Sequence, residues 1–200
     1  MDIVVVIVLL LTVFFVLWGF WGKRLKTIMS KFYRLMISPA KREAIVWKDL
    51  KKLFQRMEWK HGVFEQEKYI KAGFTINDSE GISFFYSVRN NDFECFTRVI
   101  EDFPEEMTSD FFILAQHFNN ILNYGMVNID ISRRSVDFVM KEDILVSYLY
   151  PGNLYFQFEK HLDIVNDLLY KAFLRLVNEN EAPAIIIADV LDELERKKEG

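Results

Sequence analysis

The feature that most constrains this chain is an uncharged apolar stretch that runs from Ile3 to Trp21. As a helix with a rise of about 1.5 Å per residue it would reach roughly 28 Å, close to the ~30 Å hydrocarbon core of a bilayer. Trp18 and Trp21 stand at one end, where amphipathic rings favour a membrane interface. The stretch predicts a single N-terminal transmembrane helix, and we expect residues 1–22 to be a membrane anchor.

A basic segment over residues 23–40 follows the apolar stretch directly. Leu25, Ile28 and Phe32 recur at helical spacing, which indicates an amphipathic helix in the membrane interface or a continuation of the spanning helix into the cytosol. Pro39 ends this helix, because the residue before a proline is disfavoured in the α region. We expect contacts with anionic lipid head groups from the basic side chains of this segment, which are Lys23, Arg24, Lys26, Lys31 and Arg34.

The charge distribution predicts the orientation. Residues 1–42 carry a net charge of +6 and the remainder carries −10. Positive charge lies C-terminal to the stretch, so the positive-inside rule predicts a single-pass protein of the cell (inner) membrane with its N-terminus outside. Residues 41–200 would then form a cytoplasmic domain, and the single Cys95 agrees weakly with a reducing compartment. Its acidic balance argues against a nucleic-acid partner.

Hydrophobic periodicity after residue 41 predicts an α+β domain with the order α-βββ-α-ββ-α-α. The predicted antiparallel sheet is covered by helices on one face, and its turns include Arg89-Asn90-Asn91-Asp92. The segment 144–150 is either a further strand or an extended lead into Pro151-Gly152. The predicted helices are 41–60, 104–122, 153–178 and a last one from Pro183, and the predicted strands are 73–78, 82–89, 93–100, 126–131 and 136–140.

Chemistry-bearing motifs are sparse. The histidines His61, His117 and His161 show no metal-ligand spacing, so we expect no metal and no cofactor. No nucleophile motif surrounds Cys95, which is better interpreted as a small buried side chain. Asp130 flanks a predicted hairpin turn and is interpreted as a solvent-facing carboxylate that Arg133 can pair with.

Nineteen phenylalanines are the feature most in excess. Adjacent aromatic residues place rings on both faces of their elements, and only one face can fill the core. The other rings are then exposed or meet a partner or a second copy of the chain. The candidates for such a partner-binding surface are Phe85, Phe112, Tyr155 and Phe156.

The element order is similar to the fold shared by type III secretion chaperones and YbjN-like proteins. The resemblance rests on the predicted helices and strands between residues 45 and 178 and on no diagnostic motif. It implies a non-enzymatic, acidic, often dimeric domain that binds extended or helical peptide segments of partners. The chain departs from secretion chaperones in its apolar N-terminal stretch, and no functional residue is carried over.

These observations predict a membrane-anchored, non-catalytic module, chaperone-like or an adaptor, that binds an unidentified protein partner at the cytoplasmic face, with a homodimer as a further expectation. Two alternatives stay open. One is a membrane-bound hydrolase with a carboxylate and histidine site around His161 or Asp130, which a deep cleft there would favour. The other is a structural subunit of an envelope complex.

Overall fold

The computed structural model describes Gly22, residues 35–76 and residues 80–199. The chain divides into two compact units, Met1–Lys41 and Arg42–Gly200, and the second holds the sheet. The expected anchor lies outside the described residues except for Gly22, and so do Lys23, Arg24, Lys26, Lys31 and Arg34, for which lipid contacts were predicted.

The expected membrane location is contradicted. Within residues 35–76 and 80–199 no helix is long and apolar enough to cross a membrane. Helix α2 (Pro39–Met57) has 19 residues, near the required length, but charged side chains follow one another along it, from Lys41 and Arg42 to Lys51 and Lys52. We therefore correct the prediction of a single-pass inner-membrane protein with a cytoplasmic domain.

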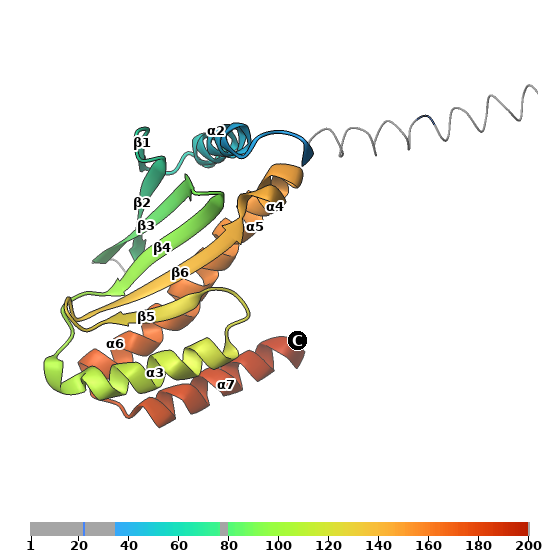
Figure 1. Ribbon diagram of the computed structural model, residues 1–200. Coiled ribbons are helices and arrows are strands. Elements are labelled where there is room, and N and C mark those ends of the chain that lie inside the picture. The colour runs from blue at the N-terminus through green and yellow to red at the C-terminus, as the bar shows by residue number, and fades with distance from the viewer. Residues whose placement is uncertain (1–21, 23–34, 77–79, 200) are drawn as a thin grey trace, which may run out of the picture. The chain divides into compact units, whose positions relative to one another are not determined.

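Six strands form one antiparallel sheet with the spatial order β1-β2-β3-β4-β6-β5 (Figure 1). Each neighbouring pair is joined along the chain by a hairpin except β4 and β6, between which two helical elements and β5 intervene. The strands are β1 (His61–Phe64), β2 (Tyr69–Ile76), β3 (Glu80–Arg89), β4 (Asp92–Ile100), β5 (Met126–Asp130) and β6 (Ser135–Asp143).

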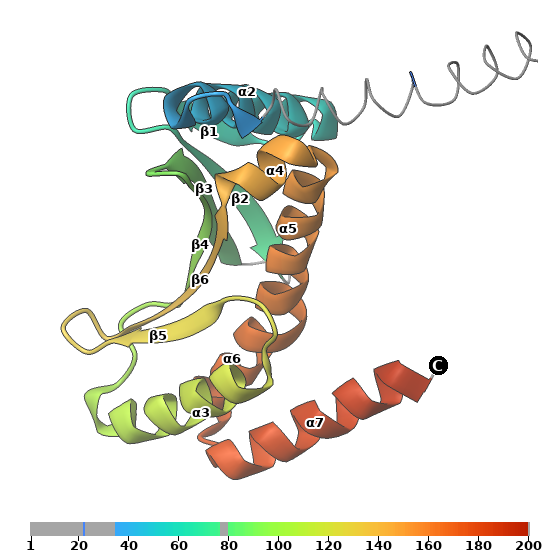
Figure 2. The same cartoon turned by 45° about the vertical axis from the view of Figure 1, so that its right-hand side comes forward.

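Helices lie along one face of this sheet, as predicted, and Figure 2 shows α5 and α6 running along its right-hand side. Besides α2, the helices are the 3-10 turn η2 (Glu105–Met107), α3 (Thr108–Ile121), α4 (Ile144–Leu149), α5 (Gly152–Asp163), the π-helix η3 (Ile164–Leu169), α6 (Tyr170–Glu179) and α7 (Pro183–Glu199). The α+β class and the antiparallel sheet are confirmed.

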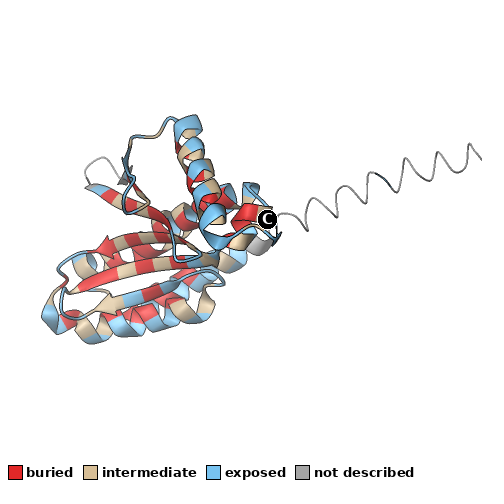
Figure 3. Ribbon diagram, turned by 45° about the horizontal axis from the view of Figure 1, so that its top comes forward, coloured by how far each residue is buried: buried red, intermediate tan, exposed pale blue. Residues whose placement is uncertain are grey.

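The core lies between the sheet and these helices. Buried and less buried residues alternate along β4, as the period of two requires, and Figure 3 shows this alternation. Phe54 of α2 contacts Tyr86 of β3 and Phe158 of α5, with ring centroids 5.3 and 5.5 Å apart. At the other end of the sheet, Phe111 of α3 stacks on Phe173 of α6. Aromatic packing therefore fixes both ends of the helical layer.

The π-helix keeps one apolar stripe of the long helix α5-η3-α6 on the core. The buried residues of this long helix include a series at every fourth position, which is His161, Val165, Leu169 and Phe173. A regular α-helix with 3.6 residues per turn would rotate such a stripe by about 40° at each step. The wider turn of η3 offsets this rotation.

Three local predictions had different outcomes. Asn90 and Asn91 have φ of 54° and 64°, which is the geometry of a two-residue type I′ hairpin, so the predicted turn is confirmed. The segment 144–150 forms helix α4 instead of a strand, because the carboxylate of Asp143 accepts the N–H of Leu145 and caps a helix start. The short edge strand β1 was missed.

Candidate functional site

The face of the sheet opposite the helices carries an apolar row that crosses all six strands. Directly opposite residues share a face, so the pairing of Phe85 with Phe96 and of Val139 with both Phe96 and Met126 places these side chains in line. The pairing of Phe64 with Tyr69 continues the row at the β1 edge. We call these six residues the apolar row: Phe64, Tyr69, Phe85, Phe96, Val139 and Met126.

The rings of the row touch one another. Phe64 stacks on Tyr69 with centroids 4.3 Å apart, and Phe85 lies 6.2 Å from Tyr69 and 5.8 Å from Phe96. The ammonium group of Lys71 lies 5.5 Å from the centre of the Phe85 ring, within cation–π range. The row is therefore a preformed aromatic surface.

This face is uncovered among the described residues. No described helix lies along it in Figure 2, where the strands curve away from α5. Phe64 and Met126 at its two edges remain 40% and 53% exposed. The solvent face of an antiparallel sheet is usually polar, so a continuous apolar row there indicates a surface that meets another molecule.

Charged pairs border the apolar row at both ends of the strands. On one side, the carboxylate of Glu94 accepts from Lys141 at 2.8 Å and from Arg89 at 3.4 Å, and the bond to Glu94 raises the pKa of Lys141. On the other side, Nε of Arg98 donates to Asp137 at 2.8 Å, and this bond raises the pKa of Arg98. These ion pairs give the face a polar rim.

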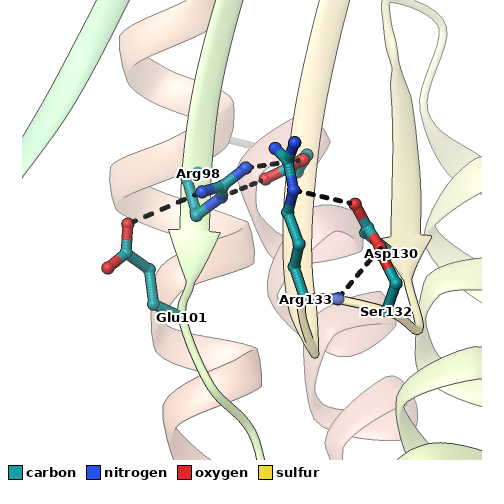
Figure 4. Close-up of polar contacts among 6 residues, drawn as sticks. Arg98, Glu101, Asp130, Ser132 and Arg133 are labelled. Atoms are coloured by element: carbon teal, nitrogen blue, oxygen red, sulfur yellow. Dashed lines mark hydrogen bonds and ion pairs between the residues drawn. The ribbon is translucent and has the colours of Figure 1, made fainter.

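The second charged pair extends into the cluster drawn in Figure 4. Arg98 also reaches Glu101 at 4.0 Å, and Asp130 accepts from the hydroxyl group of Ser132 at 2.6 Å and from the backbone N–H of Arg133 at 3.1 Å. These hydrogen bonds lower the pKa of Asp130. The cluster therefore orders the β5–β6 turn, and Asp130 is a turn-stabilising carboxylate on the surface, as expected.

A cleft opens next to the apolar row, where β3 separates from β4. The pairing of β3 with β4 ends at Phe84 and Thr97. Gly81, Ile82 and Ser83 of β3 therefore pair with β2 alone. The cleft has a volume of about 850 Å³ and is lined by four residues of β3 and four of β4, with α6 behind them. Lys71, Phe85 and Phe96 also line it, so it is continuous with the uncovered face; the α6 residues are Tyr170, Leu174, Val177 and Asn178.

A smaller hollow lies within the row itself. It has a volume of about 350 Å³ between the rings of Tyr69, Phe85 and Phe96, with Arg89 and Glu94 at its border. Ser87 also lines it, and its buried hydroxyl group has no hydrogen-bond partner among the described residues. The uncovered face thus has depressions that can accommodate side chains of a bound segment.

The structure separates the four aromatic residues predicted to bind a partner. Phe85 is in the apolar row, whereas Phe112 lies exposed on α3, and Tyr155 and Phe156 lie exposed on α5. Phe156 packs edge-on against Tyr124 at 6.0 Å, on the helical side of the molecule. The predicted residues do not form one surface.

Sequence reasoning missed most of the apolar row. The position of Phe96 on the uncovered face could have been predicted from the alternation along β4. Phe93, Cys95 and Thr97 point to the core, so Phe96 must point away from it. Phe64 belongs to the unpredicted strand β1, and Met126 is the first residue of β5, just before the buried Val127. Only the strand register places these residues in one row with Phe85.

His161 occupies the core instead of a cleft. It has no exposed surface, and its ring nitrogens lie 3.2 Å from the hydroxyl oxygen of Thr97 and 3.3 Å from that of Tyr86. The ring also stacks on Phe138, and burial lowers the pKa of His161 to about 3. A side chain enclosed in this way joins sheet to helix, and this arrangement gives no support to the alternative of a hydrolytic site around it.

Comparisons with known proteins give one structural likeness. The chain matches no protein-family profile and no curated protein. A solved structure of the Yersinia pestis type III secretion chaperone SycH, in complex with a stable fragment of YscM2, is similar with 11% sequence identity and a TM-score of 0.35, over 58% of this chain and 97% of that chain. The predicted resemblance is thereby confirmed as one of topology, and a TM-score of this size carries no argument about function.

Proposed function

We propose that this chain is a non-catalytic protein-binding module that holds an extended segment of a partner protein on the uncovered face of its sheet. The observation that carries the proposal is the apolar row, in which Phe64, Tyr69, Phe85 and Phe96 contact one another where an antiparallel sheet normally presents polar side chains. Covering these rings removes apolar surface from water and favours association.

The shape of the face favours an extended segment. The cleft exposes one side of β3 at Gly81–Ser83, where its β4 partners are missing, and strand edges recruit extended chains through main-chain hydrogen bonds. Side chains of such a segment alternate, so every second one can meet the apolar row. The Glu94–Lys141 and Arg98–Asp137 pairs at the rim supply polar contacts that set its register.

A peptide-display experiment tests this proposal. The full-length protein is used to select binders from a library of random displayed peptides, and each binder is then measured against the Phe85→Ser/Phe96→Ser double variant. We expect the double variant to lose most binding, at least tenfold in affinity for the majority of the selected peptides, because two central rings of the row are removed.

The matched control is Phe112→Ser, which removes an exposed ring from α3 on the other side of the molecule. It should leave the affinities within about twofold. A selection without binders, or binders that tolerate the double variant and lose affinity in the control, would overturn the proposal. Thermal unfolding of both variants shows that they are folded.

A second copy of the chain is the competing occupant of the same face. Two apolar rows facing each other would make a two-fold dimer. Light scattering of the full-length protein and of the double variant at several concentrations separates the cases. If the wild-type protein is a dimer and the double variant is a monomer, the occupant of the face is a second copy of the chain. If the two proteins have the same mass, the face is free to bind a partner protein.

A further inference from the structure

A second groove lies on the helical side of the molecule, between the π-helix η3 and the last helix α7. It has a volume of about 370 Å³ and is separate from the uncovered face of the sheet. Its floor is apolar and its border is acidic. The floor is formed by Ile164, Leu168, Val190 and Leu194, and the border by Lys160, Asp163, Asp167 and Glu193.

The spacing of these residues shows that two helix faces form the walls. One wall is formed by Lys160 and the residues 3, 4, 7 and 8 positions after it, Asp163, Ile164, Asp167 and Leu168, which is one face of the continuous helix α5-η3. On α7, Val190, Glu193 and Leu194 share a face in the same way. Each wall therefore presents an apolar stripe with carboxylates along its border.

The buried residues of helix α7 lie in its first half, among the side chains of this helix that the structure describes. These buried residues are Pro183, Ile186, Ile187 and Val190, and the main element contacts of α7 are with α3 and α6. Figure 2 shows the C-terminal half leaving the other helices, so that α7 diverges from α5. The groove lies where the two helices part, and this geometry leaves room for a third helix against both walls.

The charge of the border selects the occupant. Three carboxylates, those of Asp163, Asp167 and Glu193, surround the apolar floor, against the single cation of Lys160. The ammonium group of Lys160 lies 5.9 Å from the ring of Phe156, which is on its own helix. A helix with an apolar stripe flanked by Lys or Arg complements both the floor and the border.

We propose that the groove between η3 and α7 binds a basic amphipathic helix of a partner protein. The apolar stripe of that helix packs on Ile164, Leu168 and Leu194, and its basic side chains pair with Asp163, Asp167 and Glu193. A π-helix in one wall fits such a role, because the wider turn sets the direction of the side chains that form the wall. This site is independent of the uncovered sheet face.

The test uses a synthetic helix of about 18 residues with leucines at positions i, i+3, i+4 and i+7 and lysines beside them. Its binding to the full-length protein is followed by fluorescence anisotropy at low and at physiological salt. Two matched peptides serve as probes of mechanism: one carries Glu in place of every Lys, and one carries Ser in place of every Leu. We expect the basic peptide to bind, more weakly as salt rises, and both matched peptides to bind at least tenfold more weakly.

The variants locate the site. Asp163→Lys/Asp167→Lys should reduce the affinity for the basic peptide about tenfold at low salt, because two favourable charges become repulsive. Asp192→Lys/Glu195→Lys changes the net charge equally on residues of α7 that do not line the groove, and it should reduce the affinity by no more than about twofold.

The proposal is overturned if the wild-type protein does not bind the basic peptide, or if both charge-reversed proteins lose affinity equally, which would mean attraction to the overall acidic charge. Leu194→Gln tests the floor without a change of charge, and an unchanged affinity in this variant would also overturn the proposal. All changed side chains are exposed or half-exposed, so the variants are expected to fold, and circular dichroism checks this.

Discussion

A ring nitrogen of His161 lies 3.3 Å from the hydroxyl oxygen of Tyr86, deep in the core between α5 and β3. The other ring nitrogen lies 3.2 Å from the hydroxyl group of Thr97 on β4. A neutral imidazole has one donor and one acceptor nitrogen, and a hydroxyl group can serve either. The three side chains therefore satisfy one another without a charge, and they tie the long helix to two central strands.

The buried imidazole predicts an acid-sensitive fold. Burial lowers the pKa of His161 to about 3 in the folded protein, against 6.5 in an exposed histidine. Between these values the unfolded state binds a proton that the folded state does not, so stability falls as the pH falls below 6.5. We expect this histidine to contribute a loss of about 1.4 kcal/mol per pH unit through most of that range.

Urea unfolding at several pH values between 7 and 4 measures this loss. The His161→Gln variant is less stable overall because a buried network is broken, but it lacks the titrating group. Its unfolding free energy should depend less steeply on pH than that of the wild-type protein. Equal pH slopes in the two proteins would show that His161 is not kept neutral by the fold.

Glu43 links α2 to two turns of the sheet. Its carboxylate accepts the backbone N–H of Asn91 at 2.9 Å and the ammonium group of Lys68 at 3.1 Å. The bond from Asn91, and then the one from Lys68, lowers the pKa of Glu43. Stability from this carboxylate is present above its ordinary pKa near 4.5 and is lost as the pH falls through the lower folded value.

Glu43→Ala should therefore lower the unfolding free energy by about 1–2 kcal/mol at pH 7, and by less near pH 3. Glu67→Ala, which removes an exposed carboxylate in the β1–β2 turn, is the control and should change stability by less than about 0.5 kcal/mol. Urea titrations at both pH values check this. A loss that is the same at pH 3 and pH 7 would contradict the role of the ionised carboxylate.

Gly125, just before β5, is required by its conformation and by its neighbours. Its φ is +77°, and an added Cβ would lie 2.5 Å from the Phe138 ring and 2.7 Å from Met140. We expect Gly125→Ala to cost about 2–4 kcal/mol from backbone strain and overpacking together. Gly73→Ala, with nothing within 4 Å of the added carbon, should cost no more than about 1 kcal/mol. Thermal unfolding compares the two, and equal losses would refute the explanation.

The sequence predicted those elements whose signal is local. The Asn90-Asn91 turn follows from residues that tolerate positive φ, and the long helix follows from its continuous apolar stripe. The segment 144–150 was wrongly expected to be extended, because its β-branched and aromatic residues favour a strand while the deciding contact is the cap by Asp143. Strand β1 has four residues, too few to show a period.

The candidate site depended on non-local information. Phe85 lies on the face of its strand that points away from the core, but its neighbours Tyr69 and Phe96 come from other strands, and only the register brings them together. Phe112 and Phe156 satisfied the same rule of exposed aromatic residues yet lie on helices away from the row. Exposure at one position does not predict which exposed rings share a surface.

The most direct test of the central claim is site-specific photo-crosslinking of the full-length protein to a peptide obtained by display selection. A photoreactive phenylalanine analogue replaces Phe96 in one protein and Phe112 in another, and mass spectrometry identifies the crosslinked residues. We predict efficient crosslinking from position 96, in the apolar row, and little from position 112, on α3. Crosslinks from position 112 with none from position 96 would contradict the assignment of partner binding to the uncovered face of the sheet.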